Sequence, residues 1–192
     1  GGHALLGDAR AVVAAVDALV DEASGQRALT GTLRIGVIPT VAPYLLPVVL
    51  RALRRHLPDL SPESREEQTS RLLADLASGR VDVAVLAVPT GAVGLSEAPL
   101  YDEDFVLVVP PGHPLGGATG LPRTALRGQD LLLLDDGHCL RDQALDLCRS
   151  ARAMGSVSSA ARASSLGTVV QLVAAGLGVT LLPATALAAE TR

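Results

Sequence analysis

Hydrophobic and polar residues recur with different periods along this chain, and each period predicts a type of element. From Leu5 to Val20 the apolar residues recur at steps of four and three, which is the spacing of a helix with a narrow apolar seam. Because this seam is narrow for a core face, the helix either pairs with its counterpart in a second copy or packs on its own domain. The glycines and small polar residues of 22–31 predict a linker.

Strands and helices alternate after the linker. A strand over 33–37 precedes a helix over 43–56, and a second helix over 69–79 precedes an apolar run at 81–88 that predicts a buried parallel strand. Pro62 argues against a strand between the two helices. The order of strand, helix, helix and strand predicts the α/β class, with an open and mostly parallel sheet.

The pattern changes near Pro99, where we expect a second lobe to begin. Residues 30–98 would then form the first lobe and residues 99–192 the second, with residues 1–29 as the end of a linker helix and its linker. The second lobe is expected to contain, in order, a strand at 105–109, a Gly- and Pro-rich loop at 110–122, a buried strand at 131–134, a helix at 139–152, a stretch without clear pattern, a helix at 165–175 and a strand at 179–182.

Charge and composition narrow the possible functions. The formal net charge of -4 and pI near 5.5 argue against a surface devoted to nucleic acid. The chain contains no lysine, which excludes lysine-based covalent catalysis. Without a secretory signal or a membrane-spanning apolar run, we expect the chain in the cytoplasm, where its two cysteines would stay reduced.

Both cysteines lie in one short segment, Cys139 and Cys148. In a continuous helix, nine residues would separate their Cα atoms by about 13.5 Å and place the side chains on opposite faces. A disulfide requires Cα atoms within about 7 Å. Joining these two sulfurs would therefore unwind the segment, so oxidation would act as a conformational switch.

The surroundings of Cys139 favour a reactive thiolate. It follows the helix-start sequence 135–137, and backbone N–H groups, His138 and Arg141 would stabilise a negative charge, although the nearby aspartates oppose it. A thiolate attacks peroxides, and the sulfenic acid that results condenses with a second thiol, for which Cys148 is the candidate. Alternatively, both cysteines are ordinary buried residues. A metal site is the weakest reading, because the spacing and further ligands do not fit.

Several separated segments of the chain form a recognisable set: 36–40, 43–47, 67–69, 137–143 with Cys148, and 173–176 with 182–183. Together they resemble the regulatory domains of the peroxide-sensing LysR-type transcriptional regulators. The Ala-Ala-Gly and Leu-Pro segments are general to LysR-type effector domains, whereas Gly-His-Cys-Leu-Arg-Asp-Gln with a second cysteine is much more specific.

The resemblance implies a two-lobed fold like the type 2 periplasmic binding proteins, here truncated at its C-terminal end. It assigns Cys139 as the peroxidatic and Cys148 as the resolving cysteine, and it places Thr40, Thr69 and His138 near the peroxide. For both threonines, a helix N-cap is an equally good explanation. The resemblance also implies a regulator rather than an enzyme, without a metal or other cofactor. Its partners would be hydrogen peroxide, a thiol reductant, a homodimer or homotetramer, and DNA bound through an N-terminal helix-turn-helix domain absent from this chain.

Three other functions compete with peroxide sensing. A LysR-type domain could bind a small metabolite between its lobes, with the cysteines incidental. A thiol peroxidase would turn over peroxide, but the chain has no C-x-x-C motif. A periplasmic solute receptor would share the fold but need a signal sequence.

Overall fold

The computed structural model describes residues 29–151 and 157–191, with no side-chain detail for 157–162. The helix and most of the linker predicted before residue 29 lie outside the described residues. The described chain divides into two compact units, unit 1 up to Glu103 and unit 2 from Asp104 onward. Each unit is considered by itself.

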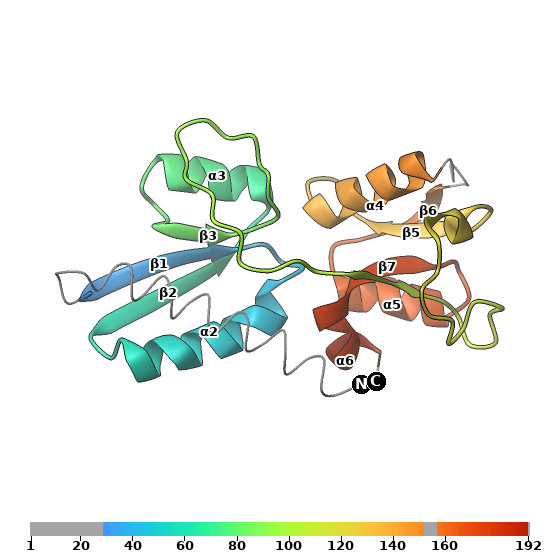
Figure 1. The fold of residues 1–192 in the computed structure, drawn as a ribbon, viewed down its shortest axis with the longest axis horizontal. Helices are drawn as coiled ribbons and strands as arrows, with labels where there is room; N and C mark the ends of the chain where they lie inside the picture. The colour runs from blue at the N-terminus through green and yellow to red at the C-terminus, as the bar shows by residue number, and fades with distance from the viewer. Residues whose placement is uncertain (1–28, 152–156, 192) are drawn as a thin grey trace. The chain divides into compact units, whose positions relative to one another are not determined.

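Unit 1 is a three-stranded parallel sheet with one helix on each face (Figure 1). Its strands lie in the order β2-β1-β3, and the pairs β1–β2 and β1–β3 are both parallel. The predicted first strand and both predicted helices of this unit are confirmed. The elements are β1 (Gly31–Val37), α2 (Ala42–His56), β2 (Leu60–Glu66), α3 (Thr69–Ala77) and β3 (Val83–Val85).

Two expectations for unit 1 are wrong. Residues Leu60–Glu66 form a strand despite Pro62, which pairs in register with Leu33. Because β2 lies at the edge of the described sheet, a residue without an N–H group can be accommodated there. The apolar run 81–88 forms only the short strand β3, which pairs with β1 over three residues. It is not a buried strand, because β3 lies at the opposite edge of the described sheet and Val83 is 41% exposed.

Unit 2 contains two small sheets with helices packed against them. The strand pair β4–β7 is antiparallel and β5–β6 is parallel, and α4 and α5 lie on opposite sides of β5 (Figure 1). The predicted strands and helices of this unit are confirmed to within a few residues. The elements are β4 (Phe105–Val108), η1 (Arg123–Leu126), β5 (Leu131–Leu134), α4 (Cys139–Ser150), β6 (Val157–Ala163), α5 (Leu166–Ala174), β7 (Thr180–Pro183), η2 (Ala184–Ala186) and α6 (Leu187–Glu190).

Strand β6 was not expected from the sequence. Its residues are Val-Ser-Ser-Ala-Ala-Arg-Ala, which have neither the β-branched content nor the alternation that predicts a strand. The strand forms through parallel pairing with β5, whose four leucines are all buried. Unit 2 therefore combines parallel and antiparallel pairs, and the α/β class is confirmed.

A fully buried aspartate organises one side of unit 1. The carboxylate of Asp75 accepts hydrogen bonds from Arg80 at 2.6 and 2.9 Å and from Arg65 at 3.3 Å, and Arg71 lies 3.6 Å away. The bond from Arg80 lowers the pKa of Asp75, burial opposes this effect, and the other two arginines add to it. A lowered pKa means that the ionised carboxylate stabilises the folded state.

We expect Asp75→Asn to lower the free energy of unfolding at neutral pH, because three arginines lose their common partner. Because the pKa of Asp75 is lower in the folded state, its carboxylate stabilises the fold fully above about pH 4, the pKa of an aspartate in the unfolded chain. This stabilisation is lost as the pH falls through the lower pKa of the folded state. Urea unfolding at pH 7 and pH 3 measures the difference. Asp82→Asn, at a partly exposed ion pair with Arg34, is the control with the smaller effect. An Asp75 effect that is equal at both pH values would contradict this reading.

Candidate functional site

Both cysteines belong to one continuous helix, α4, as the sequence predicted. Cys139 is its first residue and Cys148 lies in its last turn, and neither is in a disulfide. Nine residues of helix separate their backbones by about 13.5 Å, which is about twice the reach of a disulfide. The thiols therefore cannot join while α4 remains helical between them.

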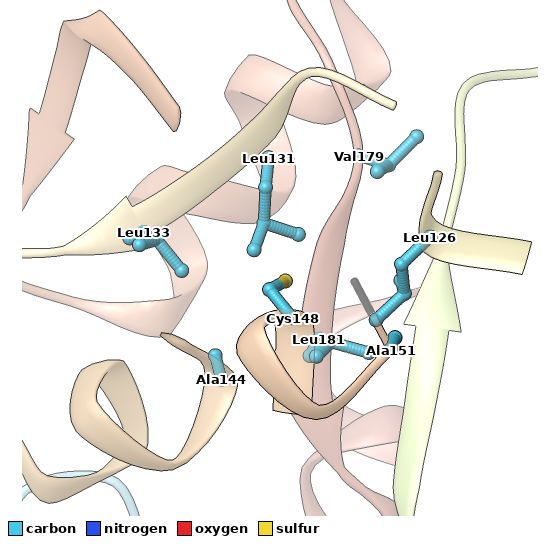
Figure 2. Close-up of a cluster of buried hydrophobic side chains, with 8 residues drawn as sticks. All are labelled: Leu126, Leu131, Leu133, Ala144, Cys148, Ala151, Val179 and Leu181. Atoms are coloured by element: carbon cyan, nitrogen blue, oxygen red, sulfur yellow. The ribbon is translucent and has the colours of Figure 1, made fainter. Parts of the chain in front are cut away.

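Cys148 faces the hydrophobic core of unit 2. Its side chain points from α4 toward Leu131 of β5 (Figure 2), and the residue is 5% exposed. Burial raises the pKa of the Cys148 thiol, so this sulfur stays protonated and unreactive in its present position. The cluster around it consists of Leu126, Leu131, Leu133, Ala144, Ala151, Val179 and Leu181.

Cys139 occupies a different environment at the start of the helix. The residue is partly exposed, whereas its neighbours His138 and Leu140 are both buried. His138 is the N-cap residue of α4, and Gly137 before it has a φ of 91°, a left-handed value that favours glycine. This turn makes Cys139 the first residue of α4, in the turn whose Arg141 N–H donates to the His138 carbonyl at 3.0 Å.

Arg141 ties the start of α4 to the turn before it. Its Nε lies 2.9 Å from the carboxylate of Asp136, and its Nη1 donates to the carbonyl of Leu134 at 3.0 Å. The arginine side chain is mostly buried. Sequence reasoning placed Arg141 beside the thiol, whereas these contacts use its guanidinium to fix the loop between β5 and α4.

The other end of α4 is held by an arginine that sequence reasoning missed. Arg127, just after η1, donates from Nε to the carbonyl of Ala151 at 3.0 Å. Ala151 is the buried C-cap residue of α4 and belongs to the same cluster as Cys148. The partner is a main-chain carbonyl 24 residues away, so no local spacing in the sequence could have indicated this bond.

The two candidate threonines follow the carboxyl ends of neighbouring strands in the unit 1 sheet. Val37 and Glu66 are partners in the β1–β2 register, and Thr40 and Thr69 each follow three residues later. Both therefore come just after the carboxyl ends of neighbouring parallel strands, where α/β proteins commonly bind ligands. Thr40 is buried. His138 and Cys139 lie together in unit 2, so the structure groups these four residues as two pairs.

Helix capping does not explain either threonine. The N-cap residue of α2 is Val41 and that of α3 is Gln68, and neither cap residue makes a side-chain capping bond. Thr69 is instead the first residue of α3, and its hydroxyl oxygen is buried without a hydrogen-bond partner among the described residues. A buried hydroxyl in this state is able to bind a small polar molecule or water.

The described residues contain no group of three or more His, Cys, Asp or Glu side chains arranged to hold a metal ion. Within the same residues, no helix has the length and apolar content needed to cross a membrane. The two thiols lie in unlike surroundings: Cys139 is partly exposed and Cys148 is buried.

Comparison with known proteins shows one consistent similarity. The sequence profile described as the LysR substrate binding domain matches residues 26–192. A protein of Streptomyces viridosporus named "Probable hydrogen peroxide-inducible genes activator" is 57% identical over 191 residues, which are 99% of this chain and 61% of that protein. The chain thus spans about three fifths of the length of this curated relative.

Two solved structures of Corynebacterium glutamicum OxyR are similar over the whole chain. A cysteine-to-serine variant with hydrogen peroxide bound is 47% identical with a TM-score of 0.83, and the match covers 100% of this chain and 60% of that protein's chain. The oxidised form is 49% identical with a TM-score of 0.74, again over 100% of this chain and 60% of the other.

Proposed function

The chain belongs to the LysR substrate binding domain family, and from this premise we propose that it is the regulatory domain of a transcriptional regulator that senses hydrogen peroxide. In this proposal Cys139 is the peroxidatic cysteine and Cys148 the resolving cysteine. Residues 30–98 and 99–192 are the two lobes of the domain. The relatives named for hydrogen peroxide and for OxyR support the ligand and the family of regulators.

One observation carries the proposal: a single helix holds an accessible thiol at its start and a buried thiol near its end. This arrangement lets an oxidant reach Cys139 while protecting Cys148. It also makes the disulfide incompatible with the reduced fold. A chemical signal is thereby converted into a change of backbone structure.

The chemistry takes place in two balanced steps. The Cys139 thiolate attacks one oxygen of hydrogen peroxide, the O–O bond breaks, and the departing hydroxide takes up a proton to leave as water, with Cys139 now a sulfenic acid. The thiolate of Cys148 then attacks the sulfenic sulfur, forming the disulfide and releasing the sulfenic oxygen as a second water after protonation. Two thiols are oxidised and one peroxide is reduced; a cellular dithiol reductant reverses the change.

Thr40, Thr69 and His138 are the groups that we propose for holding the peroxide. Hydroxyl and imidazole groups can donate to and accept from a small molecule that itself does both. Two observations support this role: the Thr69 hydroxyl has no hydrogen-bond partner within the part of the chain that the structure describes, and Thr40 and His138 are buried. Donors near the departing oxygen would stabilise its developing negative charge.

We propose further that the domain works in the cytoplasm as part of a homodimer or homotetramer. DNA binding would belong to a helix-turn-helix domain outside this sequence, consistent with the net negative charge of the chain. A reducing compartment returns the thiols to their resting state between exposures.

The direct test is to treat the reduced 192-residue chain with one equivalent of hydrogen peroxide and to map disulfides by mass spectrometry. We expect an intramolecular link between Cys139 and Cys148 and the consumption of one peroxide per chain. Two unmodified thiols after treatment would remove the proposal. Continuous peroxide consumption with a thioredoxin-type reductant would instead indicate a thiol peroxidase, and a ligand-dependent rise in melting temperature that survives loss of both cysteines would indicate a metabolite-binding domain.

A further inference from the structure

The two ends of α4 are held by separate contacts, and each contact restrains the cysteine at its own end of the helix. Arg141 holds the start of the helix to Asp136 and Leu134. Arg127 holds the end of the helix through the carbonyl of Ala151. For a disulfide to form, either Cys139 must enter the core or Cys148 must leave it.

The surroundings of the two thiols favour the departure of Cys148. Moving Cys139 inward would place a sulfenic acid among leucine side chains, and a polar group buried without hydrogen bonds is costly. Moving Cys148 outward exposes only a small side chain. In its present position, burial raises the pKa of the Cys148 thiol. Contact with water would remove this effect, so that the thiol can ionise and attack the sulfenic sulfur of Cys139.

Departure of Cys148 disturbs the contact at the end of the helix. Ala151 lies three residues after Cys148, on the same face, and both belong to the buried cluster shown in Figure 2. Arg127 follows directly after Leu126, another member of that cluster. A movement that takes Cys148 out of the cluster therefore pulls the Ala151 carbonyl away from Arg127.

We infer that Arg127 is a positioning residue that sets how readily the sensor oxidises, by holding the C-terminal end of α4 in the reduced form. This inference rests on the proposed redox function. The hydrogen bond stabilises the dithiol form and is lost in the disulfide form. Its removal should therefore shift the equilibrium toward the disulfide without changing the chemistry at Cys139.

The test is a redox titration of the 192-residue chain against a thiol–disulfide buffer. We expect Arg127→Ala to raise the equilibrium constant for disulfide formation about tenfold, the effect of one hydrogen bond from a charged donor. For a two-electron couple this is a midpoint potential about 30 mV more negative. Arg127→Lys, which keeps a positively charged donor, should restore part of the difference.

A matched control separates this effect from a general loss of charge or stability. Arg123→Ala removes an exposed arginine from η1 and should leave the midpoint potential unchanged. In a Cys148→Ser background, Arg127→Ala should leave the rate at which peroxide oxidises Cys139 unchanged, because that step precedes movement of Cys148.

The possible failures are distinguishable. If the unsubstituted chain forms no Cys139–Cys148 disulfide, the proposed function fails. If the disulfide forms but Arg127→Ala and Arg123→Ala titrate at the same potential, the proposed function stands and the inference about Arg127 is overturned. A slower oxidation of Cys139 in the Arg127→Ala, Cys148→Ser variant would also overturn it, because Arg127 would then act on the first step.

Discussion

Cys139→Ser should abolish the reaction of this chain with hydrogen peroxide. A serine hydroxyl is not ionised at neutral pH and does not attack peroxide as a thiolate does. The remaining thiol cannot substitute for it, because Cys148 is 5% exposed, lies among leucines and has a pKa raised by burial. We expect peroxide loss at the rate seen in buffer alone, measured by the peroxide remaining with time.

Cys148→Ser is the matched variant, since it makes the same atomic change at the other end of α4. It should still consume one peroxide per chain and accumulate a sulfenic acid at Cys139 that a dimedone-type reagent traps. Neither variant should form an intramolecular disulfide. Rapid peroxide consumption by Cys139→Ser would show that the roles of the two cysteines are assigned wrongly.

The segment to which we assign the redox chemistry could be recognised from the sequence because its information is local. Gly137 through Gln143, with a second cysteine nine residues after Cys139, predicted both the family resemblance and the helix that separates the thiols. The family and the α/β fold are confirmed by comparison with known proteins, and the helix is confirmed by the structure.

Elements whose stability comes from pairing were harder to predict. Residues Val157–Ala163 have little intrinsic preference for a strand, and they form one because β5 offers a partner. Pro62 disfavours a central strand, but the sequence does not say that Leu60–Glu66 will lie at an edge. Both errors come from judging a strand by its own residues alone.

The contacts that hold α4 were also beyond sequence reasoning. Arg127 binds a main-chain carbonyl distant in sequence, which no side-chain pattern records. The capping explanation for Thr40 and Thr69 followed a sound local rule, yet the chain begins each helix at a different residue. The register of β1 with β2, rather than local sequence, places both threonines after the carboxyl ends of neighbouring strands.

Oxidation should cause a large loss of structure in α4. The Cα atoms of Cys139 and Cys148 must approach from about 13.5 Å to within about 7 Å, which a continuous helix does not allow. Removing Cys148 and Ala151 from the cluster also takes away the packing that stabilises this helix. Amides of α4 should then exchange with solvent at least about a hundredfold faster. This corresponds to a fall of about 2.8 kcal/mol in the free energy of opening the helix, since about 1.4 kcal/mol changes the exchange rate tenfold.

Helix α5 provides an internal control for this change. It lies in the same unit, has a serine N-cap and buries Leu166, Val169, Val170 and Val173, and it contains no cysteine. Its amides should exchange at similar rates in the reduced and oxidised protein. Faster exchange in both helices would indicate general unfolding of unit 2.

Hydrogen–deuterium exchange over residues 139–151, measured in the reduced chain and in the chain carrying the mapped disulfide, shows whether α4 unwinds when the two sulfurs join. We predict that protection in this segment is lost on oxidation and returns on reduction, while α5 is unchanged. A Cys139–Cys148 disulfide in a chain whose α4 amides remain as protected as before would contradict the claim that these sulfurs can join only when the helix unwinds.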